Sequence, residues 1–327
     1  MFELPSILTA QSLLDKAFGR AAKATAKGPD RATRARNLGV ARVRVAGEAI
    51  TQTLRGYVAG FPSLDRLPPF YRELVDVLVD RGKLKKHLAA AGWAADRARE
   101  ITREYRRRIG RASGPAIGGL RREAYGRLSS LVTQVSSDLD ALIEARRAFR
   151  RVPEIDPAVP TIVVAGYPNV GKSSFVRAVS TGRPKIAAYP FTTQGVSLGH
   201  IERGAMRYQI LDTPGILDRP MAERNKMERQ AIAALTHVAD GVVFLLDPSE
   251  SCGYPLDAQR RLLDEVQALF SSVPIAVVEA KADLVATPSK YPRVSVLTGE
   301  GVPEVLELLL AKVTSRGPEG APRPVAP

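Results

Sequence analysis

Two patterns of hydrophobic positions divide the chain near residue 152. Before this point, apolar residues recur at spacings of three and four within stretches rich in Ala, Leu, Arg and Glu. This spacing predicts amphipathic helices, and breaks that contain Gly and Pro separate about five of them. The last stretch, residues 120–149, carries its apolar residues at Leu128, Leu131, Val132, Val135, Leu139, Leu142 and Ile143. Residues 1–152 are therefore predicted to form a helical bundle.

From Pro160 onward, short β-branched runs alternate with helical stretches. This alternation is typical of a mostly parallel sheet whose strands are joined by crossover helices. Strands are predicted over residues 161–165, 196–201, 206–211, 241–246, 274–278 and 293–296. We expect an α/β domain over residues 153–315 and a disordered tail over residues 316–327, where Gly, Pro and Ala dominate.

Charge separates the same two halves. The chain of 327 residues has a formal net charge of +14, and residues 1–152 contain 30 Lys and Arg against 15 Asp and Glu, whereas residues 153–327 contain 18 against 19. Clustered positive charge raises affinity for phosphates through counterion release. The helical domain is thus predicted to bind a polyanion, either RNA or an acidic membrane surface. Trp93 is expected to pack between helices, with stacking on RNA bases as the alternative.

The sequence lacks the features of a membrane or secreted protein. No apolar run approaches the roughly 18 residues of a membrane span, and the N-terminal residues do not resemble a signal peptide. Cys252 is the single cysteine, which excludes an internal disulfide and a cysteine metal cluster. We expect a cytoplasmic protein without a membrane partner.

A phosphate-binding loop follows the first predicted strand. Residues 166–173 match the pattern G-x-x-x-x-G-K-[ST] between a predicted strand and a predicted helix. In such loops backbone amides surround the phosphates, the lysine reaches the terminal phosphate oxygens, and the next hydroxyl binds Mg²⁺. The predicted nucleotide contacts are Gly166, Tyr167, Pro168, Asn169, Val170, Gly171, Lys172, Ser173 and Ser174.

A second motif, Asp-Thr-Pro-Gly at 212–215, follows another predicted strand. A carboxylate there can hold the Mg²⁺ shell, and the amide of Gly215 can sense a γ-phosphate. Between the motifs, Thr192 and Thr193 stand in a segment without a clear pattern, and Thr193 is the preferred ligand when a triphosphate is bound. The predicted metal ligands are Ser173, Thr193 and Asp212.

Base recognition is predicted at residues 280–283, Ala-Lys-Ala-Asp, after the strand at 274–278. The Asp283 carboxylate can accept two hydrogen bonds from the ring nitrogen and exocyclic amine of guanine, a pattern that adenine cannot supply. The stem of Lys281 can lie over the base. Backbone amides near the end of the last strand can meet the guanine carbonyl oxygen, at Ser295, Val296 and Leu297. The cofactors predicted are therefore GTP or GDP with Mg²⁺.

The order of these motifs resembles the nucleolar GTP-binding protein family within the Obg-like P-loop GTPases. In the second half, the resemblance rests on residues 166–173, Tyr-Pro-Phe-Thr-Thr at 189–193, Asp-Thr-Pro-Gly-Ile-Leu-Asp at 212–218, and Asp-Pro-Ser-Glu-Ser-Cys-Gly at 247–253. In the first half, it rests on residues 61–65, 69–74 and 150–157. It implies an α+α/β fold, in which an N-terminal helical bundle precedes a Ras-like P-loop GTPase domain with a mostly parallel sheet, in the compact archaeal-type form.

The resemblance also implies a role. Such a protein binds precursor ribosomal RNA and assists assembly of the large ribosomal subunit. The expected partners are therefore precursor rRNA and large-subunit particles, with an activating protein as a further candidate.

Two positions depart from the family pattern. Ala280 stands where the family has the asparagine of Asn-Lys-x-Asp, and losing its hydrogen bonds costs about 1 to 3 kcal/mol. Ile216 stands where many small GTPases carry a glutamine that orients the attacking water, so hydrolysis is expected to be slow. In GTPases with a similar Pro-Asn-x-Gly-Lys-Ser loop, the asparagine can ligate K⁺, and Asn169 is the candidate here, with stabilisation of the loop as the alternative. The expected catalytic set is Lys172, Thr193, Gly215 and Asn169.

Three hypotheses stay open at this point. The first is a GTPase switch that acts on a pre-ribosomal particle, and the second is a hydrolytically idle RNA-binding assembly scaffold. The third is a GTPase on a membrane surface, for which the sequence lacks a lipidation motif. Ala280 and Ile216 favour the second hypothesis, whereas the intact phosphate motifs favour the first.

Overall fold

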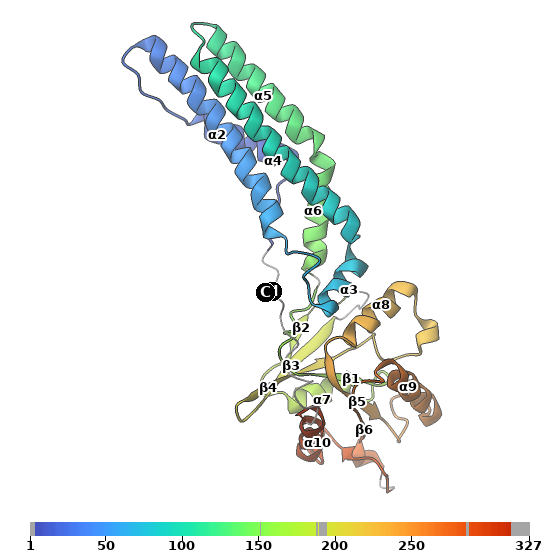
Figure 1. The fold of residues 1–327 in the computed structure, drawn as a ribbon. Helices are drawn as coiled ribbons and strands as arrows, with labels where there is room; N and C mark the ends of the chain where they lie inside the picture. Colours follow the sequence, from blue (N-terminus) through green and yellow to red (C-terminus); the bar gives the residue numbers. More distant parts are fainter. Residues whose placement is uncertain (1–3, 151, 188, 190–194, 286–287, 315–327) are drawn as a thin grey trace. The chain divides into compact units, whose positions relative to one another are not determined.

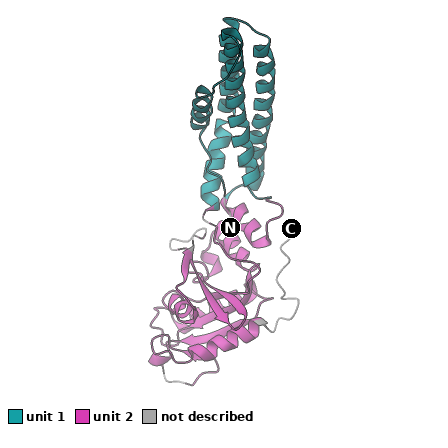
Figure 2. Ribbon diagram, turned by 90° about the vertical axis from the view of Figure 1, so that its left-hand side faces the viewer, with its two compact units in different colours: residues 1–63, 79–149 teal, residues 64–78, 150–327 magenta. Residues whose placement is uncertain are grey.

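The structure, a computed structural model, describes residues 4–150, 152–187, 189, 195–285 and 288–314. The chain forms two compact units that do not follow the order of the sequence. One unit combines residues 1–63 and 79–149, and the other combines residues 64–78 and 150–327 (Figure 2). Within the stretch predicted as the helical domain, residues 1–152, the segment 64–78 packs with the second unit. The predicted tail, 316–327, lies outside the described residues.

In its described residues, the first unit is a bundle of α1 (Ala10–Ala22), α2 (Arg31–Gly60), α4 (Arg81–Gly110), α5 (Ala116–Gln134) and α6 (Ser136–Phe149) (Figure 1). Carboxylates start the two longest helices: Asp30 accepts a hydrogen bond from the amide of Thr33 at 2.9 Å, and Asp80 accepts one from the amide of Lys83 at 3.0 Å. Such N-caps satisfy amides that have no partner within the helix.

Small residues let α2 and α4 approach closely along their length. Gly47 of α2 faces Thr102 of α4, and a Cβ at Gly47 would lie 1.7 Å from the Thr102 hydroxyl oxygen. The facing stripe of α4 is buried and made of alanine, at Ala91, Ala94, Ala95 and Ala98. Larger side chains at these positions would force the helices apart.

The stretch predicted as the last helix of the first half is two helices. Helix α5 ends at Gln134, and α6 begins at Ser136. Val135 between them has φ −103° and ψ 18°, outside helical geometry. The apolar spacing does not reveal this break, because Leu131 before it and Leu139 after it are both buried in the same bundle.

The second unit begins with α3 (Pro69–Leu78), which packs against α8 (Lys226–Leu235). The Tyr71 hydroxyl donates a hydrogen bond to the carbonyl of Ile155 and contacts that of Pro153 at 3.3 Å. Glu73 of the same helix lies 2.8 Å from Nε2 of His237. Two segments that carry the family resemblance, 69–74 and 150–157, thus meet in one unit.

A seven-stranded sheet forms the core of the second unit, in the order β2-β3-β4-β1-β5-β6-β7. Its strands are β1 (Thr161–Ala165), β2 (Lys185–Ala187), β3 (Val196–Arg203), β4 (Met206–Asp212), β5 (Ala239–Leu246), β6 (Ile275–Ala280) and β7 (Arg293–Val294). Strands β4, β1, β5, β6 and β7 pair in parallel, and β2 and β3 join antiparallel. The predicted α+α/β fold with a mostly parallel sheet is confirmed.

Helices α7 (Lys172–Val179), α9 (Leu256–Leu269) and α10 (Val302–Thr314) pack against this sheet. Strand β1 lies at its centre, between β4 and β5, and all its residues are buried. Loops that follow β1, β4, β5 and β6 therefore emerge at one edge of the sheet, where parallel strands end. Across the described ranges, no helix is long and apolar enough to cross a membrane.

Candidate nucleotide-binding site

The phosphate-binding loop connects β1 directly to α7, as the sequence predicts. Its backbone needs unusual torsions: φ is 136° at Gly166, 62° at Asn169 and 107° at Gly171. A Cβ at Gly166 would also lie 2.6 Å from the carbonyl oxygen of Leu245 in β5. Glycine meets these demands, and asparagine tolerates the left-handed region better than most residues.

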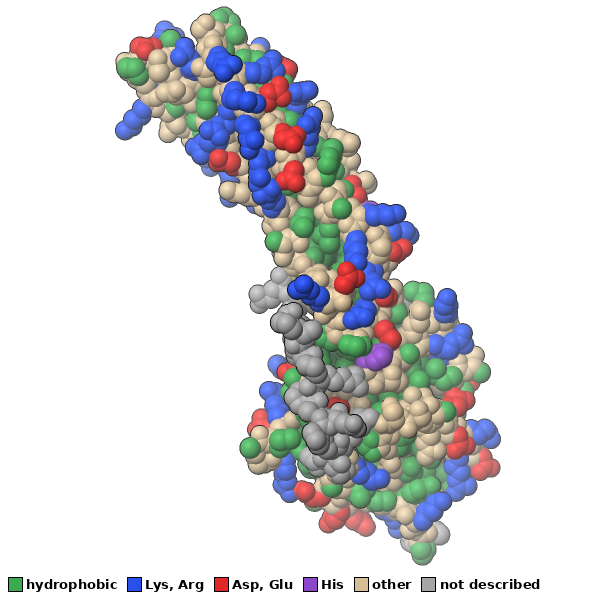
Figure 3. Space-filling view, viewed as in Figure 1, with side chains coloured by type: hydrophobic (Ala, Val, Ile, Leu, Met, Phe, Trp, Pro, Cys, Tyr) green, Lys and Arg blue, Asp and Glu red, His purple; other side chains and the backbone are tan. Residues whose placement is uncertain are grey.

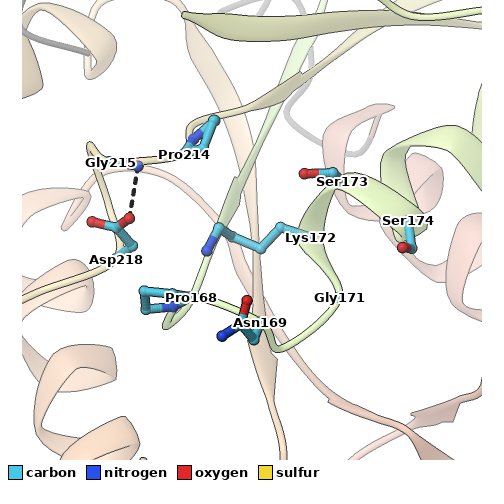
Figure 4. A pocket seen from close by; sticks show the side chains of 9 residues that line it. All are labelled: Pro168, Asn169, Gly171, Lys172, Ser173, Ser174, Pro214, Gly215 and Asp218. Atoms are coloured by element: carbon cyan, nitrogen blue, oxygen red, sulfur yellow. Dashed lines mark hydrogen bonds between the residues drawn. The ribbon is translucent and has the colours of Figure 1, made fainter. Parts of the chain in front are cut away.

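A pocket of about 560 Å³ opens beside this loop (Figure 4). Six of the predicted contacts line it: Pro168, Asn169, Gly171, Lys172, Ser173 and Ser174. Pro214, Gly215 and Asp218 complete the lining from the segment after β4. Tyr167 and Val170 are buried beneath the loop, where the Tyr167 ring packs on Tyr254 with 4.4 Å between centroids.

Lys172 is buried and already directed into the loop. Its Nζ donates hydrogen bonds to the carbonyl oxygens of Gly166 at 2.7 Å and Tyr167 at 2.8 Å. Burial lowers the pKa of Lys172, and the nearby carboxylates of Asp218 and Asp212 oppose this effect. The amine is thus held where it can bind a phosphate oxygen.

Two of the predicted metal ligands lie in contact. The Ser173 hydroxyl donates to Oδ2 of Asp212 at 2.5 Å, and Asp212 is only 1% exposed. Burial raises the pKa of Asp212, and its Oδ1 has no hydrogen-bond partner among the described residues. An unpaired buried carboxylate oxygen beside a hydroxyl suits Mg²⁺, which takes few protein ligands and binds phosphate oxygens besides. The third predicted ligand, Thr193, and the alternative Thr192 lie outside the described residues.

The segment after β4 is held by a buried arginine. Asp218 accepts a hydrogen bond from the Gly215 amide at 2.6 Å through Oδ2, and Arg224 donates to its Oδ1 at 3.0 Å. Arg224 also donates to the carbonyl oxygens of Gly215 at 2.5 Å and Ile216 at 2.7 Å. The sequence analysis placed Asp218 in the motif at 212–218 without a role and did not consider Arg224, because the contact between them depends on the turn that leads into α8.

The predicted base-binding residues lie at the ends of β6 and β7. The Ser295 hydroxyl donates to Oδ1 of Asp283 at 2.5 Å, which fixes the carboxylate that is expected to meet guanine. Ala280 is buried at the end of β6, and Val296 is half-buried. Leu297 is 85% exposed, so its side chain makes little contact with the protein.

Lys281 is positioned by a third loop, which follows β5. Its Nζ contacts Oδ2 of Asp247 and the hydroxyl of Ser251, both at 2.8 Å. Asp247 is fully buried, which alone would raise its pKa, but hydrogen bonds from Lys281 and Ser249 outweigh burial and lower it. The Cys252 amide donates to the same carboxylate at 2.8 Å. The family resemblance covered this loop, but its role as a support for Lys281 emerges only from the structure.

Comparison with known proteins agrees with this architecture. The family model for the NOG1 N-terminal helical domain matches residues 2–156, and the model for nucleolar GTP-binding protein 1 (NOG1) matches residues 226–283. An uncharacterized protein of Methanocaldococcus jannaschii is 37% identical over 288 residues, which cover 86% of this chain and 81% of the relative.

Named relatives are longer than this chain. Nucleolar GTP-binding protein 1 of Saccharomyces cerevisiae is 33% identical over 289 residues, which cover 86% of this chain and 44% of the relative. The chain thus spans less than half the length of this relative. A crystal structure described as a nucleolar GTP-binding protein 1 from Plasmodium falciparum is 31% identical, with a TM-score of 0.46, and the match covers 51% of this chain and 93% of that one. Because two family models match the chain and relatives are at least 33% identical to it over 86% of its length, the chain belongs to the nucleolar GTP-binding protein 1 family.

Proposed function

We propose that the second unit binds GTP and GDP with Mg²⁺ and hydrolyses GTP slowly. The observation that carries this proposal is the contact between Ser173 and the buried Asp212, whose second carboxylate oxygen has no hydrogen-bond partner among the described residues. Lys172 lines the pocket beside Ser173, and Asp283 follows β6, two strands from β1 in the same sheet. Relatives such as the one from Saccharomyces cerevisiae are named as GTP-binding proteins, which supports the same assignment.

Each residue of the pocket would have a separate role in phosphoryl transfer. Lys172 would neutralise charge on the terminal phosphates, and Ser173 and Asp212 would hold Mg²⁺, which balances the charge that develops on the leaving group. Ile216 is buried and has no polar atom in its side chain, so it cannot orient water. Slow turnover is the expected consequence, since positioning supplies much of the catalysis in this reaction.

Asn169 is the candidate to support turnover through K⁺. It lines the pocket, and no hydrogen bond from its side chain to the described residues is found. The left-handed backbone of Asn169 explains why asparagine suits this turn. Its side-chain amide oxygen remains available for a cation. A bound K⁺ would place positive charge near the phosphates, as an arginine finger does.

Calorimetry and a phosphate-release assay test this proposal. GDP should bind and ADP should not, because Asp283 accepts two hydrogen bonds only from guanine. Phosphate release from GTP should be slow and faster in KCl than in NaCl, and Asn169→Ala should remove this difference without changing GDP affinity by more than about twofold. Equal affinity for ADP and GDP would refute the guanine assignment. Equal turnover in both salts would refute the K⁺ role alone.

Ala280→Asn should tighten binding of GDP and GTP by about five- to tenfold. The variant restores an amide at the buried end of β6, where the family pattern has hydrogen bonds to the phosphate-binding loop and the base. Calorimetry on the variant and the parent chain measures the change. Val296→Ala serves as the control, because the contact expected there is made by the backbone. An unchanged or weaker affinity in Ala280→Asn would mean that the surrounding residues already compensate for the alanine.

We further propose that the helical unit docks on RNA during assembly of the large ribosomal subunit. Lys and Arg side chains crowd its visible face (Figure 3). Four arginines of α4 are exposed, and no acidic partner for them is found in the described part of the chain: Arg99, Arg103, Arg106 and Arg107. Such unpaired guanidinium groups are free to bind phosphate.

One aromatic side chain of α4 is also exposed. Trp93 of α4 is 49% exposed, so it is not the packing anchor that the sequence suggested. An exposed indole can stack on an unpaired base, which makes the stacking alternative the better supported of the two. If GTP turnover proves undetectable while RNA binds, the idle assembly scaffold becomes the better description of the protein.

A further inference from the structure

The amide that is expected to sense a γ-phosphate already has an acceptor. The Gly215 amide donates to Oδ2 of Asp218 at 2.6 Å, a short hydrogen bond to a charged acceptor (Figure 4). Gly215 has φ 76°, and the turn folds back so that a residue three positions later reaches its amide. The contact is therefore formed within the segment that follows β4.

The Asp218 side chain is fixed from the opposite side by Arg224. The guanidinium group donates to Oδ1 of Asp218 and to two carbonyl oxygens of the same turn, those of Gly215 and Ile216. The Arg224 side chain is 1% exposed and that of Asp218 is 13% exposed. A buried guanidinium group that bonds both the carboxylate and the backbone of the turn holds the carboxylate in one orientation.

Asp218 also belongs to the phosphate pocket. It lines the pocket together with Lys172, and Figure 4 shows the amine of Lys172 directed toward the side where Asp218 and Gly215 lie. Of the carboxylates that favour the charged form of Lys172, Asp218 has a larger effect than Asp212. The carboxylate thus faces both groups that would recognise a terminal phosphate, the amide of Gly215 and the amine of Lys172.

We propose that Asp218 competes with the γ-phosphate for the Gly215 amide and thereby sets the preference between GDP and GTP. One amide hydrogen cannot form two full-strength hydrogen bonds to two anions, and two anions that approach the same amide repel each other. GDP leaves the contact between Asp218 and Gly215 intact, whereas GTP has to displace the carboxylate. This inference rests on the proposed binding of guanine nucleotides and adds a specificity residue to it.

Titration of Asp218→Asn and Asp218→Ala with GDP and with a non-hydrolysable GTP analogue tests the proposal. Affinity for GDP should stay within about twofold of the parent chain, and affinity for the analogue should rise by about tenfold, since a charged competitor is removed. Asp218→Asn keeps the shape of the side chain, so it carries the test if the alanine variant fails to fold. Asp264→Asn, an exposed carboxylate of α9, removes the same charge away from the pocket and should change neither affinity.

Two results would overturn this inference. An unchanged ratio of analogue to GDP affinity in a folded Asp218→Asn variant would show that the carboxylate does not compete. A weaker affinity for the analogue would show that Asp218 helps to hold the triphosphate. If the parent chain binds neither GDP nor the analogue, the proposed nucleotide site itself fails, which is a distinct outcome.

Discussion

Lys172→Ala is expected to weaken binding of GDP and GTP by at least about a hundredfold while the protein stays folded. The lysine would form charge-assisted hydrogen bonds with phosphate oxygens, each contributing about 1.5 to 3 kcal/mol, and alanine forms none. Its present hydrogen bonds, to the carbonyl oxygens of Gly166 and Tyr167, lie at the wall of an open pocket. Water can replace the amine there, so the melting temperature should fall by only about 2 to 4 °C.

Calorimetry with GDP and thermal unfolding by circular dichroism measure the two effects. Lys226→Ala is the matched control, because this lysine is exposed at the start of α8 and no side-chain contact is found for it among the described residues. Its nucleotide affinity should equal that of the parent chain. If Lys172→Ala binds GDP as tightly as the parent chain, the role assigned to the phosphate-binding loop is wrong.

The sheet and the phosphate-binding loop could be predicted from the sequence because local signals agree there. Short runs rich in β-branched residues, bounded by Gly, Pro or polar residues, mark most of the predicted strands, and the predicted strand at 161–165 matches β1 at both ends. The edge strand β2 escaped prediction, since three residues at Lys185–Ala187 carry no readable period. The loop is readable because its torsions and its chemistry demand specific residues, above all glycine at positions 166 and 171.

What the sequence could not reveal depends on contacts between distant segments. Helix α3 has ordinary amphipathic spacing, and contacts with distant residues place it in the second unit, among them the hydrogen bond from Tyr71 to the carbonyl of Ile155 and its packing on α8. Arg224 reads as one more arginine in a basic chain, and its burial against the turn after β4 requires the fold. Spacing along the chain carries no information on such pairings.

This division into units changes how the RNA proposal should be tested. Truncation after residue 152 would separate α3 from α8 and expose Phe70, Leu74 and other apolar residues that are buried in the second unit. The measurement therefore needs the full chain with substitutions on the surface of the helical unit. Deproteinised large-subunit ribosomal RNA is the probe, and a filter-binding titration at several salt concentrations gives the affinity.

Binding of this RNA to the full chain should fall by roughly 10³ between 50 and 200 mM salt, as expected for about six phosphate contacts. Replacing Arg106 and Arg107 together with glutamine should reduce the slope of log affinity against log salt by about two units, one for each lost contact. Arg108→Gln, in the same turn of α4, should have a smaller effect. Its guanidinium group already pairs with Glu104 at 3.4 Å and Glu123 at 3.3 Å.

Comparing these neighbouring arginines distinguishes binding through specific phosphate contacts from attraction by the net charge of the helical unit. A loss spread equally over Arg106, Arg107 and Arg108 would indicate attraction by net charge alone, because the ion pairs of Arg108 would then make no difference. Arg260→Gln, which removes a paired charge from α9 of the other unit, should leave the slope unchanged. If the variant at Arg106 and Arg107 keeps the full slope, these arginines merely solvate the helix surface, and the helical unit does not dock on RNA through this face of α4.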